Sequence, residues 1–116
     1  MAFPLLKLLV LRTHRLEELK KFYESIGVDF VKERHGQGPS YYAGAIGSAV
    51  LQLHPLPKDA PEPDKSVRLG FVVRNLGAIA NELGSTGIRI GPSERQSPAV
   101  VVKDPDGRTV ELTQEP

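Results

Sequence analysis

The stretch LLKLLVLRTHRLEELKKFYESIG, residues 5–27, changes its pattern of apolar side chains part-way along. Residues 5–13 are mostly Leu and Val, which is typical of a short buried strand. From residue 15 the apolar side chains follow helical spacing, and charged ones take the opposite face. Gly27 is placed to end the helix, because glycine adopts the left-handed conformation without steric cost. The stretch therefore predicts a strand followed by an amphipathic helix.

A second stretch, VRLGFVVRNLGAIANELGSTGIRI at residues 67–90, repeats this pattern. It predicts a strand over 67–73 and a helix over 75–86, with Asn75 as the N-cap and Gly87 at its end. Between the two stretches, residues 55–64 hold four prolines in ten positions, which favours an extended linker. The chain thus divides near its midpoint into two halves of similar pattern.

Each half continues with three predicted strands. Turn residues such as those at 104–107 separate them, and the ranges are 29–34, 40–46 and 49–54, then 88–90, 99–103 and 108–113. The halves align as an internal duplication, because Gln52 follows Leu8 by 44 residues and Glu111 follows Arg68 by 43. We predict an α+β fold with two βαβββ units in one domain over 1–116. The first unit spans 5–54, the linker 55–66 and the second unit 67–114.

Composition narrows the classes of function. Fifteen Lys and Arg against fourteen Asp and Glu leave a net charge of +1, which argues against a nucleic-acid surface and a polybasic membrane anchor. The chain has no cysteine, so it has no disulfide, thiolate nucleophile or cysteine-based zinc site. No apolar run approaches the roughly 20 residues of a membrane span, and no small-residue cleavage site follows the apolar N-terminus. We expect a cytoplasmic protein without nucleic-acid or membrane partners.

Three segments in order resemble the vicinal oxygen chelate superfamily, which includes glyoxalases, bleomycin resistance proteins and extradiol dioxygenases. They are LEELKKFYESIG at 16–27, the strand-helix-strand stretch at 67–90, and DPDGRTVEL at 104–112. The resemblance covers nearly the whole chain. It implies that each βαβββ unit curls its sheet into a trough, and that two chains pair as a homodimer that encloses the sites.

The same resemblance locates four positions that supply metal ligands in metal-using relatives. They are filled here by Leu8, Gln52, Arg68 and Glu111. Leucine has no donor atom and the arginine guanidinium offers no lone pair, so only Gln52 and Glu111 are capable of holding a metal. We therefore expect no bound metal and no cofactor, and predict that Arg68 forms a salt bridge with Glu111 in its place.

Strand alternation predicts which other side chains line the troughs. Tyr41 or Tyr42, depending on register, is expected to add an aromatic wall, and we predict Tyr42 in this role. The predicted ligand-binding residues are Arg12, Tyr42, Gln52, His54, Arg68 and Glu111. No residue is assigned a catalytic role.

Three functions remain open at this point. The first is a metal-free module that binds a small organic molecule in a trough at the homodimer interface. The second is a lyase, isomerase or dioxygenase that depends on a divalent metal, and the third is a structural or regulatory domain with a filled trough. Leu8 and Arg68 favour the binding module and the structural or regulatory domain over the metal-dependent enzyme. Enzymatic activity is left open.

Overall fold

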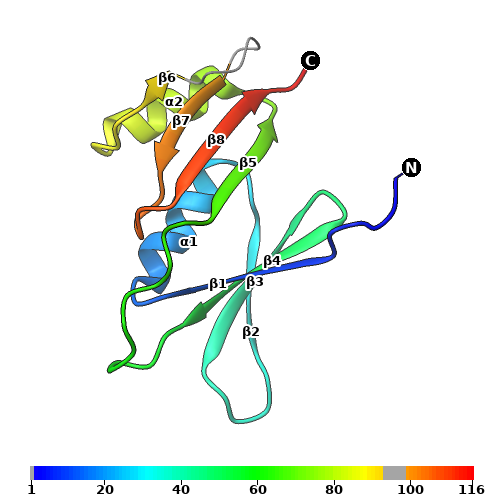
Figure 1. The fold of residues 1–116 in the computed structure, drawn as a ribbon, viewed down its shortest axis with the longest axis vertical. Helices are drawn as coiled ribbons and strands as arrows, with labels where there is room; N and C mark the ends of the chain where they lie inside the picture. The colour runs from blue at the N-terminus through cyan, green and yellow to red at the C-terminus, as the bar shows by residue number, and fades with distance from the viewer. Residues whose placement is uncertain (1, 93–98) are drawn as a thin grey trace. The chain divides into compact units, whose positions relative to one another are not determined.

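The computed structural model describes residues 2–92 and 99–116 of the chain. These residues form two compact units, and along the linker the boundary falls between Pro63 and Asp64. Each unit has a four-stranded sheet and one helix (Figure 1). The predicted α+β fold with two βαβββ units is confirmed.

The first unit contains β1 to β4 and α1. Its elements are β1 (Leu8–Thr13), α1 (Leu16–Ser25), β2 (Phe30–Arg34), β3 (Ser40–Ile46) and β4 (Ala49–Pro55). The strand order is β1-β4-β3-β2, in which β1 runs parallel to β4 and the other pairs are antiparallel. The helix between β1 and β2 therefore carries the chain across the sheet to the opposite edge.

The second unit repeats this topology. Its elements are β5 (Arg68–Val73), α2 (Leu76–Ser85), β6 (Gly91–Pro92), β7 (Ala99–Lys103) and β8 (Thr109–Gln114). The order is β5-β8-β7-β6, again with one parallel pair, β5 and β8. The duplication inferred from residue spacing is thus a duplication of topology.

The predicted helix ends agree with the structure. The side chain of Asn75 accepts a hydrogen bond from the backbone N–H of Ala78, as an N-cap does. Gly27 and Gly87 follow the two helices with φ of 113° and 87°, in the left-handed region. One strand is displaced, because pairing with β7 begins at Gly91 and not within the predicted 88–90. Ile88 and Ile90 have the side-chain pattern of a strand but precede the paired residues. That pattern alone therefore placed the strand too early.

Alternation gives the first sheet one buried face and one open face. The buried face carries Leu11, Leu51 and Leu53, each at most 4% exposed. The α1 helix belongs to this face, since the Tyr42 hydroxyl of β3 donates a hydrogen bond to the Glu17 carboxylate of α1 at 2.6 Å. We call the other side the first open face; it carries Leu8, Val10, Arg12, Val31, Glu33, Tyr41, Ala43, Ala45, Val50, Gln52 and His54.

The second sheet is divided in the same way. Its buried face carries Val102, Val110 and Leu112, each at most 1% exposed. The start of α2 is attached to the end of β8, because the Gln114 side chain accepts a hydrogen bond from the Leu76 N–H and donates one to the Arg74 carbonyl. The second open face carries Arg68, Gly70, Val72, Ala99, Val101, Lys103, Thr109, Glu111 and Thr113.

The turn between β7 and β8 contains a buried group of charges. The Arg108 guanidinium donates from Nη1 to Asp104 Oδ2 at 3.1 Å and to Asp106 Oδ2 at 3.0 Å. Asp104 Oδ1 also accepts the backbone N–H groups of Asp106 and Arg108. All three side chains are almost fully buried, so they serve as a structural ion cluster that holds the ends of β7 and β8 together.

Replacing Arg108 by Met should lower the free energy of unfolding by about 3 kcal/mol or more, because two buried carboxylates would lose their cation. Urea denaturation followed by circular dichroism measures this loss. Arg74→Met is the matched control, since Arg74 is 91% exposed and its pair with Glu115 is a surface contact. Equal, small losses in both variants would contradict the structural role of the cluster.

Candidate functional site

Four polar side chains meet on the first open face, on three neighbouring strands. The register places Tyr41 of β3 next to His54 of β4 and opposite Glu33 of β2, while Gln52 lies two residues before His54 on the same face. The Tyr41 and His54 rings stack with centroids 4.3 Å apart and planes 11° apart. We call Glu33, Tyr41, Gln52 and His54 the His54 cluster.

Hydrogen bonds define the polar groups that the cluster offers. His54 Nε2 lies 2.8 Å from Gln52 Oε1, so this ring nitrogen carries the proton and donates it to the amide oxygen. The neutral ring then keeps an acceptor lone pair at Nδ1, and the Gln52 amide keeps its N–H donors. The Tyr41 hydroxyl donates to Glu33 Oε2 at 3.3 Å, which fixes the phenol beneath the imidazole. The cluster thus offers a donor and an acceptor side by side.

Electrostatics favour the neutral histidine. Burial lowers the pKa of His54 below its ordinary value, and the nearby Arg12 guanidinium lowers the pKa further. Arg12 pairs with His54 in the parallel β1–β4 register, so the two side chains project from the same face. Burial raises the pKa of the Tyr41 hydroxyl, and the Glu33 carboxylate adds to this shift. Near neutral pH the cluster therefore contains an uncharged imidazole and an uncharged phenol.

The register corrects the choice of Tyr42 as the tyrosine of this face. Tyr42 pairs with the buried Leu53, and its hydroxyl bonds to Glu17 of α1, so it belongs to the helix-facing side. Adjacent tyrosines in a strand project to opposite faces, and the sequence left the register undetermined. Tyr41 takes the position that was predicted for Tyr42, while Arg12, Gln52 and His54 share the predicted face.

Apolar side chains flank the cluster along β1, β2 and β4. Leu8, Val50 and Val31 are 50%, 38% and 64% exposed, and all lie on the first open face. Leu8 pairs with Val50, and Val10 pairs with Gln52, so the apolar surface leads directly to the polar groups. This arrangement of apolar walls with a few convergent polar groups is the usual form of a small-molecule site.

The remaining predicted residues, Arg68 and Glu111, lie on the second open face. Arg68 pairs with Thr109, and Glu111 pairs with Gly70, so the two charged residues are diagonal neighbours and not direct ones. Between these two described residues there is no ion pair, and the predicted Arg68–Glu111 salt bridge is wrong. The register gives Arg68 a threonine and Glu111 a glycine as direct partners, and diagonal neighbours lie farther apart than direct ones.

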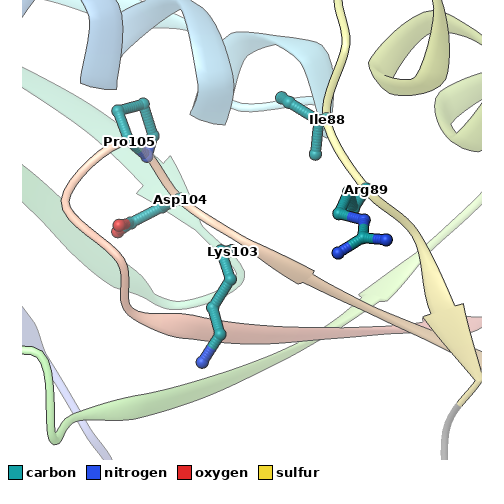
Figure 2. Close-up of a pocket in the computed structure, with 5 residues that line it drawn as sticks. All are labelled: Ile88, Arg89, Lys103, Asp104 and Pro105. Carbon is teal, nitrogen blue, oxygen red and sulfur yellow. The ribbon is translucent and has the colours of Figure 1, made fainter.

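A hollow of about 290 Å³ lies at the β7 side of the second unit. Its lining residues are Ile88, Arg89, Lys103, Asp104 and Pro105 (Figure 2). None of these residues was singled out by the sequence, because Ile88 and Arg89 precede β6 and Asp104 and Pro105 belong to the turn after β7.

The family model of the Glyoxalase/Bleomycin resistance protein/Dioxygenase superfamily matches residues 5–112. The chain belongs to this superfamily. The match covers both βαβββ units, including the strands that bear the His54 cluster, and confirms the resemblance found in the sequence.

Individual proteins that resemble this chain differ widely from it in sequence. A protein of Mycolicibacterium smegmatis, described as uncharacterized, is 37% identical over 81 residues, which span 70% of this chain and 66% of that protein. TnmS3, an antibiotic binding protein from a Streptomyces species, has a TM-score of 0.67 at 22% identity, over 100% and 99% of the two chains. A lactoylglutathione lyase from Agrobacterium tumefaciens has a TM-score of 0.64 at 17% identity, over 97% and 96%.

Many members of the superfamily use a divalent metal, so the four corresponding positions must be tested for fit. Leu8 has no donor atom, Arg68 has no lone pair, and the Oε1 atom of Gln52 already accepts the proton of His54. In residues 2–92 and 99–116, no three His, Cys, Asp or Glu side chains are grouped so as to hold a metal ion. The described residues at these positions do not fit a metal of the kind that needs three or four protein ligands.

Sequence reasoning missed Glu33 as a member of the cluster. It lies on an edge strand with the charged neighbours Lys32 and Arg34, so its local sequence is typical of a solvated residue. Glu33 alternates with Val31, so the sequence indicated that the two side chains share a face. The pairing of β2 with β3 was needed to place Glu33 opposite Tyr41.

None of the helices in the described part of the chain is long and apolar enough to cross a membrane.

His54 should titrate below the ordinary histidine pKa of 6.5, and Arg12→Gln should raise its pKa because a nearby positive charge is removed. Titration of the imidazole carbon-bound proton signals by NMR measures both values. Arg34→Gln is the control, since it removes the same charge from β2 and leaves the His54 surroundings intact. A His54 pKa that responds equally to the two changes would contradict the contact with Arg12.

The lowered pKa also links stability to pH. As the pH falls below about 6.5, unfolded chains take up the proton first, so the free energy of unfolding should decrease until the folded His54 is itself protonated. His54→Asn should lack this part of the pH dependence. Urea denaturation at a series of pH values between 7.5 and about 4.5 tests it, and identical profiles for the two proteins would refute the linkage.

Proposed function

We propose that the protein binds a small organic molecule with a planar aromatic part on its first open face, without a catalytic metal. The stacked Tyr41–His54 pair beside the Gln52 amide is the observation that carries this proposal. A flat ring gains from stacking against an aromatic side chain, and such pairs contribute about 0.5–1.5 kcal/mol beyond burial. The exposed Leu8 and Val50 supply apolar contact for the rest of the ligand.

The polar groups set the chemistry of the ligand. His54 Nδ1 accepts a hydrogen bond and the Gln52 amide donates one, so a ligand that presents a donor next to an acceptor is matched to both. The positive charge of Arg12 favours a neutral or anionic ligand over a cationic one. The name of the neighbour TnmS3, an antibiotic binding protein, and the bleomycin resistance proteins in the family description agree with a binding role.

The proposal includes a homodimer, which the family resemblance implies. Large apolar side chains of the N-terminal region support it, because Phe3 and Leu6 are 79% and 63% exposed in the single chain. A second copy that covers them would remove this apolar surface from water. Light scattering coupled to size-exclusion chromatography should give twice the mass of one chain, and Leu6→Glu should shift the population toward monomer. A monomer at all concentrations would refute this part of the proposal.

Ligand binding is tested with two probes, metal-free bleomycin and 2-naphthoate, in buffer that contains EDTA. We expect amide signals of β1, β3 and β4 around Tyr41, Gln52 and His54 to shift in ¹H–¹⁵N spectra. His54→Leu should weaken binding of the responding probe about tenfold, equivalent to about 1.4 kcal/mol. Shifts confined to other elements, or no response to either probe, would contradict the proposal.

His14→Leu is the matched control for this test. His14 Nε2 donates to the carbonyl of Ala60 in the linker, so the same chemical change is made at a histidine outside the His54 cluster. Binding should stay within about twofold of the unmodified protein. If the two leucine variants weaken binding equally, His54 has no special part in the site.

A further inference from the structure

We propose that the second open face binds an oxyanion, a phosphate or carboxylate group of a small molecule, on a row of three cations. The row consists of Arg68, Lys103 and Arg89, and we call it the cationic row. It lies in the other unit and involves different chemistry from the proposed aromatic site, so the inference goes beyond the proposed function.

The register of the second sheet brings Arg68 and Lys103 into line. Arg68 of β5 pairs with Thr109 of β8, and Thr109 pairs in turn with Lys103 of β7. Paired residues project to the same face, and neighbouring strands lie about 4.8 Å apart. The two cations are therefore separated by a single small side chain, that of Thr109, across about 10 Å of sheet.

Arg89 extends the row on the other side of Lys103. Gly91 pairs with Val101 and Pro92 with Val100, so the chain that leads into β6 brings Arg89 alongside Lys103. Both residues line the hollow of about 290 Å³, and Figure 2 shows their side chains extending to the same side of the ribbon. The hollow lies beside the two cations, and the Asp104 carboxylate that also lines it is paired with Arg108.

The centre of the row is held in position before any ligand arrives. Lys103 Nζ donates a hydrogen bond to Thr109 Oγ1 at 2.6 Å. The turn that joins β7 to β8 is fixed by the buried Arg108–Asp104 and Arg108–Asp106 pairs. Groups that are already ordered lose less freedom on binding, which strengthens a site made of few contacts.

The row of residues next to the cations leaves space for a ligand. The neighbouring row contains Gly70 and Gly91, and a side-chain carbon built on Gly70 would meet no heavy atom within 4 Å. Glu111 is the carboxylate of that neighbouring row, so an anion is expected at the cationic row itself and not beside Glu111. Arg68 and Arg89 form no ion pair with any residue in 2–92 or 99–116, and an arginine fork matches the geometry of phosphate and carboxylate oxygens.

The test is a titration of the full chain with sodium phosphate and, separately, sodium acetate, at constant ionic strength set with sodium chloride. Backbone amide signals of residues 68–70, 89, 103 and 109 in ¹H–¹⁵N spectra should shift with one of the two anions. The anion that saturates at the lower concentration identifies the oxyanion as phosphate or carboxylate. No saturable shift with either anion overturns the proposal.

Substitutions separate a site from a general effect of charge. Arg68→Gln and Arg89→Gln should each raise the dissociation constant about fivefold or more, and the double variant should show no saturation. Arg74→Gln removes the same charge from the same unit at a residue that is 91% exposed, and should change the constant by less than about twofold. Spectral dispersion confirms that each variant is folded. An equal loss in Arg74→Gln, or no loss in the other two, overturns the proposal.

Discussion

Parallel pairing between the first and last strands of each unit determines which side chains share a surface. In the first unit this pairing joins Arg12 to His54, and in the second it joins Arg68 to Thr109. Because strand side chains alternate with a period of two, a slip of one residue would exchange the buried and open faces. The leucines and valines that are buried on one side hold the register, and the polar residues on the other side depend on it.

The duplicated scaffold carries different chemistry in its two copies. Equivalent registers place Leu8 where the second unit has Arg68, and His54 where it has Thr113. In the first unit the polar residues gather where β1 ends, around His54. In the second they gather where β5 begins, around Arg68. One topology thus supports an aromatic hydrogen-bonding surface in one unit and a cationic surface in the other. Core packing requires apolar residues on both buried faces, whereas it places no such requirement on the open faces.

The positions that supply metal ligands in metal-using members of the superfamily carry different chemistry here. A leucine and an arginine remove two possible ligands, and Gln52 uses its amide oxygen to orient His54. Burial and the charge of Arg12 keep the imidazole neutral near physiological pH. The result is a histidine with a defined tautomer on an exposed, partly apolar surface, which suits the recognition of organic ligands.

Sequence by itself determined the α+β fold, the duplication, the helix ends at Gly27 and Gly87, and the shared face of Arg12, Gln52 and His54. These follow from local periodicity and backbone preference, which are properties of neighbouring residues. The tertiary structure decided that Tyr41 and not Tyr42 joins His54, that Glu33 belongs with them, and that Arg68 aligns with Lys103 instead of Glu111. Those facts depend on the register between strands distant in sequence, which period-two alternation within a single strand does not specify.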